Sequence, residues 1–348
     1  MQPKAAAPAA MMVAALIRDL PASALEIASV AAPTVEADDD LVVRVEACGI
    51  CGTDLHIMAG ESYRPVTPFV LGHEPVGTVV AAGDAAQEWL GRRIATTNFT
   101  GCGRCAWCLD GDERVCPNLV SITGVLGVWG GYAEYIRVHA RQALEVPGTL
   151  GTLEAASLVD CGATAANSVR VALEKRPGRV LVLGAGPIGF MCAELLRVSE
   201  VPVQVVQPSA LRRRALQDVG HDVVASIDET TLPADVVIDC AGSPAVVADG
   251  VRALAPRGTY LLAGYSRVPE MDLAAVARKE ATLRGIRSGR RSDLAWISGL
   301  AASGAIRLPE ISSWPLTDVN AALAALRDRR VPGKAVIVPD AMWREQPA

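Results

Sequence analysis

The stretch VLVLGAGPIGFMCAELLR, residues 180–197, is the clearest indication of the fold of this chain. A short apolar run typical of a buried strand leads into a glycine-rich turn and then into a helical pattern. The glycines hold the GxGxxG spacing: the first makes the tight turn, the second lets the backbone approach a pyrophosphate, and the third permits close packing of helix on strand. The alternative is a tight strand-to-helix turn that binds no nucleotide. We predict a dinucleotide site at Gly184, Gly186, Pro187, Ile188 and Gly189.

The residues around this turn alternate between strand and helix patterns. Strands are predicted at 179–183, 203–207, 223–225, 236–240, 259–263 and 282–286, with helical patterns between most of them. Such alternation predicts a parallel, doubly wound sheet.

The N-terminal part of the chain is β-rich instead. Short apolar or alternating runs lie at 11–17, 24–30, 41–46, 77–81, 92–96 and 132–138, separated by Gly, Pro and Asp, and we expect the first two to form a hairpin. An alanine-rich helical stretch at 153–173 marks the change of pattern. A helix after about Leu294 and a last strand at 334–338 follow the doubly wound part. The sequence therefore predicts an α/β protein with two domains.

The strand after the glycine-rich turn ends at a residue that bears on the choice of cofactor. NAD-binding folds usually have an acidic residue there for the ribose hydroxyls, whereas this chain has the neutral Gln207. Ser209 follows, and Arg212 begins a run of three arginines that could donate to a 2′-phosphate. The alternative is that the arginines form a solvated helix face. The pattern favours NADP over NAD modestly.

Four cysteines are closely spaced in GCGRCAWCLDGDERVC, residues 101–116. Two residues separate each of the first three, and seven separate the third from the fourth, which lets a short loop surround one ion with four thiolates. A disulfide cluster is the alternative, but chains of intracellular character use such spacings mainly for metals. We predict structural zinc bound by Cys102, Cys105, Cys108 and Cys116.

The composition is that of an ordinary globular protein. Of 348 residues, 51% are apolar and 20% charged, and the net charge of −5 with no basic block argues against a nucleic-acid partner. No uninterrupted apolar segment is long enough to span a bilayer. The first residues superficially resemble a signal peptide, but Pro8 interrupts the apolar run and Arg18 follows closely. We expect a frayed extension over residues 1–10 and a cytoplasmic protein without a membrane partner.

Four further motifs complete a family pattern. CGICGTDLH and GHE precede the four-cysteine stretch, LVDCGATAAN follows it, and PGKAVI lies near the C-terminus. With GAGPIG, these motifs make the chain resemble the zinc-containing medium-chain dehydrogenases/reductases, the alcohol dehydrogenase family, over nearly everything beyond residue 10. The resemblance implies a GroES-like β-rich catalytic domain at 11–155, completed by 296–348, and a Rossmann domain at 156–295, with substrate in the cleft between them. It also implies a homodimer or homotetramer.

The resemblance assigns the catalytic residues. It implies that Cys51, His73 and Cys161 bind a catalytic zinc with one open position, the arrangement that lowers the pKa of a bound hydroxyl. Thr53 and His56 are implied to relay the alcohol proton. Glu74 and Asp54 would support the metal ligands, and Lys334 would approach the cofactor phosphates.

Each of these assignments has a plainer alternative. Cys161, next to Asp160, could be a buried helix cysteine; Thr53 could cap the helix that begins near Asp54; His56 could be an exposed helix residue; and Lys334 could be a surface lysine. Cys48, Cys192 and Cys240 have no metal spacing and are expected to be small buried residues.

The predicted activity is reversible hydride transfer between an alcohol (primary, secondary or polyol-like) and NAD(P)⁺, with one catalytic and one structural zinc. A zinc-free reductase of the same superfamily and a zinc-bearing, nucleotide-bound redox sensor without turnover are the alternatives. Tyr63, Phe99 and Trp129 are expected near a small-molecule substrate, and Gly52 leaves space beside the metal ligand Cys51.

Overall fold

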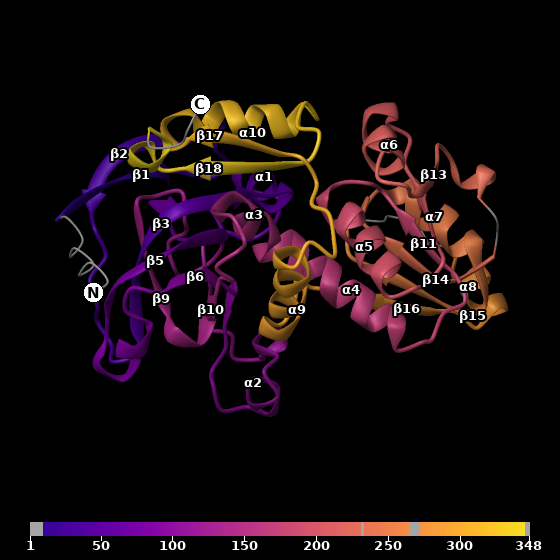
Figure 1. Ribbon diagram of the computed structural model, residues 1–348, viewed down its shortest axis with the longest axis horizontal. Helices are drawn as coiled ribbons and strands as arrows, with labels where there is room; N and C mark the ends of the chain where they lie inside the picture. The colour runs from indigo at the N-terminus through magenta and orange to yellow at the C-terminus, as the bar shows by residue number, and fades with distance from the viewer. Residues whose placement is uncertain (1–9, 231–232, 265–271, 345–348) are drawn as a thin grey trace. The chain divides into compact units, whose positions relative to one another are not determined.

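A computed structural model describes residues 10–230, 233–264 and 272–344 and divides the chain into two compact units (Figure 1). The first unit comprises residues 1–160 and 310–348, and the second comprises residues 161–309. Residues 1–9, most of the expected N-terminal extension, lie outside the described residues. Within the described residues, no helix is both long and apolar enough to cross a membrane.

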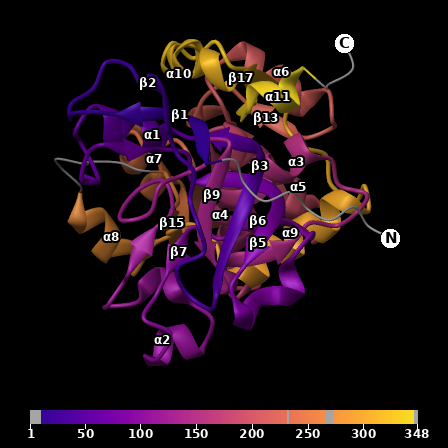
Figure 2. The ribbon, with the colours of Figure 1, turned by 90° about the vertical axis from the view of Figure 1, so that its left-hand side faces the viewer.

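The first unit is built on a seven-stranded sheet in the order β10-β6-β5-β3-β18-β17, with β9 also paired to β3. The labels β3, β5, β6 and β9 in Figure 2 mark four strands of this sheet. A smaller sheet, β2-β1-β4, contains the predicted hairpin, in which Met11 pairs with Ala31. The strands are β1 Met11–Ile17, β2 Glu26–Ala31, β3 Asp40–Ile50, β4 Phe69–Val70, β5 Glu74–Ala82, β6 Arg93–Thr96, β7 Phe99–Thr100, β8 Ser121–Ile122, β9 Tyr135–His139, β10 Ala143–Glu145, β17 Ile311–Pro315 and β18 Lys334–Val338.

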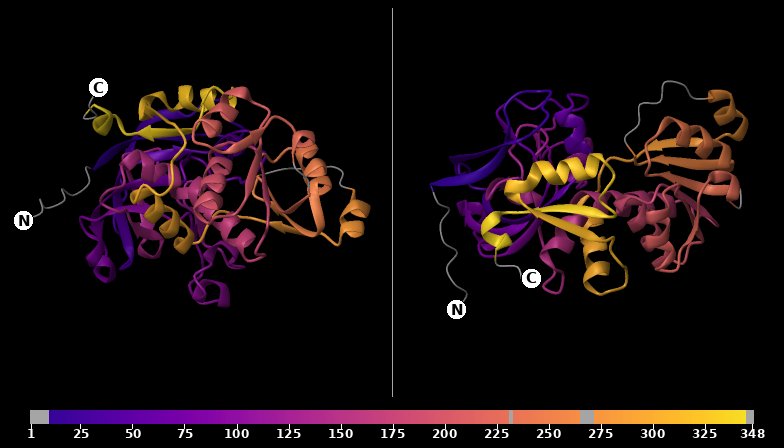
Figure 3. Two further views of the ribbon diagram at one scale, coloured as in Figure 1. Left: turned by 45° about the vertical axis from the view of Figure 1, so that its right-hand side comes forward. Right: turned by 90° about the horizontal axis from the view of Figure 1, so that it is seen from above.

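Most side chains of strand β3 are buried, as expected for a strand at the centre of a sheet. The strand is rich in valine, and its Leu41, Val43 and Val45 belong to the hydrophobic core of the first unit. The C-terminal strand β18 pairs antiparallel with β3, so that Ala335 lies opposite Ile50. The yellow C-terminal segment in Figure 3, with helix α10 (Val319–Arg327) beside β17 and β18, therefore completes the sheet begun by the N-terminal part of the chain.

The second unit contains the predicted parallel sheet, which is confirmed. Its order is β13-β12-β11-β14-β15-β16, and every pairing is parallel. The chain leaves β11 in one direction and later extends the sheet from β11 in the other, so right-handed connections put α5 and α7 on opposite faces. The strands are β11 Val180–Leu183, β12 Val203–Val206, β13 Asp222–Val224, β14 Ala234–Asp239, β15 Leu254–Leu262 and β16 Thr282–Gly285.

The helices of the first unit are α1 Gly52–Met58, α2 Ala106–Leu109, α3 Thr152–Ser157, α10 and α11 Asp340–Trp343. Those of the second are α4 Ala163–Leu173, α5 Pro187–Val198, α6 Ala210–Gln217, α7 Pro244–Ala253, α8 Leu273–Lys279 and α9 Arg291–Ala302. Short 3₁₀ turns lie at Asp84–Trp89, Glu113–Val115, Ala140–Gln142, Ile227–Glu229 and Leu316–Asp318.

The predicted helix at 153–173 is interrupted. Helix α3 ends at Ser157, a π-helical turn covers Leu158–Gly162, and α4 then begins at Ala163. Gly162 is a poor helix former, and π-turns inside helices are often found at functional sites. The turn carries Asp160 and Cys161. Their side chains therefore point in other directions than they would in the continuous α-helix predicted over 153–173.

A buried carboxylate ties the second unit together. Glu194 on α5 is fully buried and accepts hydrogen bonds from His221 Nε2 (2.7 Å), from Arg197 Nε and Nη2 (3.0 and 2.9 Å), and from the backbone amide of Arg307 (2.7 Å). Burial raises the pKa of Glu194, but the donors outweigh that effect and lower its pKa to about 2.

We expect Glu194→Gln to lower the free energy of unfolding by about 2 to 3 kcal/mol near pH 7, because the folded-state pKa lies below the ordinary value. This contribution is present above the ordinary value of 4.5 and is lost as pH falls toward the folded-state value of about 2. Denaturant unfolding of wild type and Glu194→Gln over this acidic range should therefore show that the difference in their free energies of unfolding shrinks as the pH falls. The exposed Glu200→Gln is the matched control. A pH-independent gap would contradict the ionisation assigned to Glu194.

Candidate active site and metal centres

The first metal-binding group lies in the first unit and draws on three segments of chain. Cys51 precedes α1, His73 and Glu74 lie at the start of β5, and Asp160 lies in the π-turn. One ligand atom from each lies within 4.8 Å of the others. His73 and Glu74 are almost fully buried, whereas Cys51 and Asp160 are partly exposed.

The distances within this group fit a zinc-sized ion. Asp160 Oδ2 lies 3.6 Å from His73 Nε2 and 3.9 Å from Cys51 Sγ, and Glu74 Oε1 lies 4.0 Å from His73 Nε2. Tetrahedral zinc with its usual bond lengths holds neighbouring N, O and S ligand atoms about 3.4 to 3.6 Å apart. Thiolate, imidazole and carboxylate are all ordinary zinc ligands. The residues present therefore fit a metal ion.

Asp54 supports two of these ligands from the first turn of α1. Its Oδ2 accepts hydrogen bonds from the backbone amide of Cys51 (2.9 Å) and the hydroxyl of Tyr132 (2.8 Å). Its Oδ1 lies 3.3 Å from His73 Nδ1. A carboxylate at the outer ring nitrogen orients an imidazole so that the other nitrogen faces the metal. The residue therefore has the geometry of the supporting role that we expected.

The group concentrates negative charge in a buried place. Burial lowers the pKa of His73, but the nearby carboxylates of Asp54 and Asp160 outweigh it and raise that pKa well above its ordinary value. Burial is also the main reason that the pKa of Glu74 is raised to about 8, against the opposing effect of Lys334. Without a cation the group thus retains protons, which a bound metal ion would displace.

Lys334 is a buried partner of Glu74. Only 1% of the residue is exposed, and its Nζ donates to Glu74 Oε1 (2.6 Å) and to the carbonyl of Ile50 (2.9 Å). The alternative of a surface lysine is wrong. Its predicted approach to the cofactor phosphates stays a prediction.

Helix α1 carries the two predicted relay residues. Cys51 is the N-cap, so the alternative that Thr53 caps this helix is wrong. Thr53 Oγ1 instead accepts from Cys51 Sγ at 3.7 Å, which places its hydroxyl beside the metal-binding group. His56 is partly exposed, and its Nδ1 lies 2.9 Å from Glu61 Oε2. The relay itself stays a prediction.

Cys161 is not a member of the metal-binding group found among the described residues, and Asp160 is. The helix predicted through 153–173 gave no reason to prefer one neighbour over the other. The π-turn decides between them, because it resets the direction of each side chain. The sequence LVDCG offers both Asp160 and Cys161 as potential ligands, and only the family resemblance favours the cysteine.

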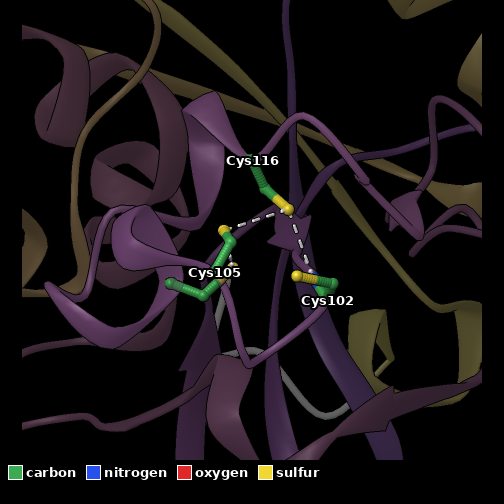
Figure 4. A group of neighbouring side chains, drawn as sticks. Cys102, Cys105 and Cys116 are labelled. Carbon is green, nitrogen blue, oxygen red and sulfur yellow. Dashed lines mark hydrogen bonds between the residues drawn. The ribbon is translucent and has the colours of Figure 1, made fainter.

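The second metal-binding group is formed by Cys102, Cys105, Cys108 and Cys116. Figure 4 shows the sulfur atoms of Cys102, Cys105 and Cys116 turned toward one another. Cys105 Sγ lies 3.5 Å from Cys108 Sγ and 3.8 Å from Cys116 Sγ. Tetrahedral Zn–S bonds of the usual length put sulfurs about 3.8 Å apart. All nine cysteines lie in the described part of the chain, and none forms a disulfide.

The loop favours thiolates over thiols at one end of this group. Hydrogen bonds from the backbone amides of Arg104 and Cys105 lower the pKa of Cys102 to about 6. Gly101 leaves no room for a side chain, since a Cβ there would lie 2.5 Å from Cys108 Sγ. Burial raises the pKa of the Cys108 thiol to about 12, so a metal ion would have to displace its proton. The spacing of the four sulfurs and the close packing at Gly101 suit one tetrahedral ion.

The glycine-rich turn has the geometry that the sequence predicts. Gly184 has φ +95° at the end of β11, and Gly186 is the N-cap of α5 with Pro187 in its first turn. A Cβ on Gly189 would lie 1.8 Å from the carbonyl oxygen of Gly184, whereas a Cβ on Gly186 would meet nothing within 4 Å. The open backbone at Gly186 and the helix N-terminus suit an anionic phosphate group.

The three arginines after β12 have different surroundings. Gln207 Oε1 accepts from the amide of Ser209 (3.0 Å), and Arg213 Nη1 donates to the carbonyls of Gln207 and Pro208. Arg213 thus stabilises the loop, and Arg214 is exposed. Arg212 is half-buried at the start of α6.

The expected substrate-side residues belong to the core of the first unit. Phe99 is buried in it, and Tyr63 and Trp129 pack against it. A Cβ on Gly52 would meet nothing within 4 Å, which agrees with open space next to Cys51. Cys48 and Cys192 are buried as expected, whereas Cys240 is only partly buried.

Comparison with known proteins identifies the family. Residues 37–148 match the alcohol dehydrogenase GroES-like domain, and residues 149–283 match the glucose dehydrogenase C-terminus. The chain is 31% identical over 291 residues to the 2-dehydro-3-deoxy-L-galactonate 5-dehydrogenase of Pseudoalteromonas atlantica, covering 79% of this chain and 84% of that protein. The chain belongs to the zinc-type medium-chain dehydrogenases/reductases, the alcohol dehydrogenase family.

Two solved structures are similar over nearly the whole chain. The cobalt- and zinc-bound thermostable alcohol dehydrogenase of Pyrobaculum aerophilum is 28% identical with a TM-score of 0.85, covering 94% of this chain and 100% of that one. A zinc-binding dehydrogenase of Sinorhizobium meliloti 1021 bound to NADP is 29% identical with a TM-score of 0.80, covering 94% of this chain and 99% of that one. The predicted combination of GroES-like and Rossmann folds is confirmed.

Removal of the buried ammonium should destabilise the first unit. We expect Lys334→Met to lower the free energy of unfolding of the metal-free protein by about 1 to 3 kcal/mol, because the buried Glu74 carboxyl loses the hydrogen bond from this ammonium. The double variant Lys334→Met with Glu74→Gln should recover much of that loss. Thermal and denaturant unfolding measure both. Equal stability of the single variant and wild type would contradict the pairing.

Proposed function

We propose that the protein is a zinc-dependent oxidoreductase that transfers a hydride between an alcohol and NAD(P)⁺, giving the aldehyde or ketone reversibly. The observation that carries this proposal is the convergence of Cys51, His73 and Asp160 on one point in the unit that contains the GroES-like match. The glycine-rich turn of the second unit supports a dinucleotide cofactor. Membership of a dehydrogenase family agrees with both.

The metal would be held by Cys51, His73 and Asp160, with Glu74 as a further oxygen donor in reach. When bound, such an ion supplies a Lewis acid that makes an alcohol hydroxyl more acidic. We replace Cys161 by Asp160 in the ligand set proposed from the sequence. The four-cysteine loop would hold the second, structural ion.

The residues of α1 would move the proton. Thr53 Oγ1 lies beside Cys51 and can accept the proton of the alcohol, and His56, partly exposed, can receive it and release it to water. Asp54 holds Cys51 and the imidazole of His73 in place meanwhile. The backbone of the turn at Gly184–Gly189 would hold the cofactor pyrophosphate, and the cofactor would accept the hydride.

The substrate class follows from relatives only in outline. The P. aerophilum relative is an alcohol dehydrogenase, and the P. atlantica relative acts on a sugar acid. We propose an alcohol of primary, secondary or polyol type. A panel of alcohols and carbonyl compounds, followed at the absorbance of the reduced nicotinamide with each cofactor, tests this directly, and no alcohol-dependent change with any member would favour the redox-sensor alternative.

The proposed ligand set includes Asp160 and leaves out its neighbour Cys161, and the two can be tested separately. We expect Asp160→Ala to reduce bound zinc from two ions per chain to one and to lower kcat/KM by at least about 10³-fold, since the ion supplies several kcal/mol of transition-state stabilisation. Cys161→Ala should retain both ions. Elemental analysis and steady-state kinetics check the pair. If Cys161→Ala loses the ion and Asp160→Ala retains it, the assignment is overturned.

Cofactor choice depends on the segment after β12. We propose NADP as the preferred cofactor, with Ser209 and Arg212 near its 2′-phosphate. Arg212→Ala should then weaken NADP by about 10- to 100-fold, the loss of a charge-assisted hydrogen bond, and should change NAD little. The exposed Arg214→Ala is the control. Dissociation constants for NADP and NAD, measured from cofactor fluorescence, give the ratio of the two affinities. A ratio that Arg212→Ala leaves unchanged would contradict this role.

A further inference from the structure

A buried amide side chain next to Asp160 has no role in the scheme above. Asn98 lies between β6 and β7 and is only 5% exposed. Its Nδ2 donates to Asp160 Oδ1 at 3.3 Å, and its backbone carbonyl accepts from Thr123. Its Oδ1 is buried and, within the described residues, has no hydrogen-bond partner.

The unpaired oxygen indicates what this side chain is for. A buried amide that meets only part of its hydrogen-bonding capacity costs free energy, so its presence needs a reason other than stability. An ionised carboxylate can only accept, so the amide must turn its NH₂ toward Asp160. The NH₂ group of Asn98 is thus the end of the amide that faces the carboxylate.

The two oxygens of Asp160 face different partners. Oδ1 meets Asn98, and Oδ2 faces Cys51 Sγ at 3.9 Å and His73 Nε2 at 3.6 Å. Rotation about the last side-chain bond would exchange or misalign these oxygens, and such terminal torsions are broad. A donor fixed on Oδ1 holds Oδ2 toward the metal-binding group.

The neutrality of the donor also matters. Glu74 is paired with the ammonium of Lys334, which offsets its charge. Asn98 orients Asp160 without adding a positive charge, so the carboxylate keeps its full attraction for a cation. Lys334 thus offsets the charge of Glu74, whereas Asn98 orients Asp160 and leaves its charge available to a cation.

We propose that Asn98 is a positioning residue that fixes the Asp160 carboxylate for metal binding. The proposal rests on the proposed function, because it takes Asp160 as a metal ligand. It predicts that Asn98 acts on metal affinity only through Asp160.

The test measures zinc affinity of the full-length protein by competition with a chromophoric chelator, and the visible spectrum of the cobalt-substituted protein. Asn98→Leu, similar in shape and without a donor, should weaken the ion at Cys51 and His73 by about 10- to 100-fold and alter the cobalt bands. The ion of the four-cysteine loop should be unaffected. Thr96→Val is the matched control, because its hydroxyl is buried without a partner in the described residues and should leave both affinities unchanged.

A double-mutant cycle separates positioning from a structural effect. The Asp160→Ala protein is expected to keep only the four-cysteine ion on purification, so its residual affinity at Cys51 and His73 is measured by titrating zinc back in. Adding Asn98→Leu should change that residual affinity less than about twofold, since the residue through which Asn98 acts is gone. If Asn98→Leu fails to fold, the smaller Asn98→Ser takes its place in the same cycle.

Two results would overturn the proposal: a zinc affinity of the folded Asn98 variant within twofold of wild type, or a full loss that persists in the Asp160→Ala background. Either can occur while wild type still binds both ions and turns over alcohol, which leaves the proposed function intact. A wild-type protein that binds only the ion of the four-cysteine loop would overturn both.

Discussion

The packing of several acidic groups into one buried place is the constraint on which the first unit depends. Asp54 and Glu74 are fully buried, and Asp160 Oδ2 lies 3.6 Å from the His73 imidazole and 3.9 Å from Cys51 Sγ. Like charges taken out of water cannot remain together without compensation. The ammonium of Lys334 faces Glu74 and compensates part of the buried negative charge. Protons retained on His73 and Glu74, whose pKa values are raised, compensate a further part. A divalent cation at the centre would satisfy the same demand, which is why this arrangement is compatible with a stable fold.

Each supporting contact reaches the group from a different part of the chain. Tyr132 fixes Asp54, Asn98 holds Asp160, and β18 delivers Lys334 through its pairing with β3. The buried sheet supplies the rigidity, because β3 ends at Ile50, immediately before Cys51, and β5 begins at Glu74. Ligands placed at strand ends keep their mutual distances better than ligands on free loops.

Much of this could be predicted from the sequence, for reasons that are local. The six strands of the second unit follow from period and spacing, and the glycine-rich turn follows from the steric needs of Gly184 and Gly189. The four-cysteine loop is short enough that its spacing determines its geometry. Two features could not be predicted from local sequence: the approach of Asp160 to Cys51 and His73, and the burial of Lys334 against Glu74. The first depends on a π-turn and the second on a strand pairing across the whole first unit. Asn98 gave no signal, because an asparagine in a polar stretch normally indicates only a turn.

The pairing of β18 with β3 has a consequence for how the protein is made. Glu74 and Lys334 are 260 residues apart, and the entire second unit lies between them in the sequence. As the chain leaves the ribosome, the parallel sheet of the second unit can assemble from its own contiguous segments. The central sheet of the first unit must wait with an open edge at β3, and with Glu74 lacking its ammonium, until the last strand is translated. The contact between Glu74 and Lys334 therefore cannot form until residues 334–338 have been made.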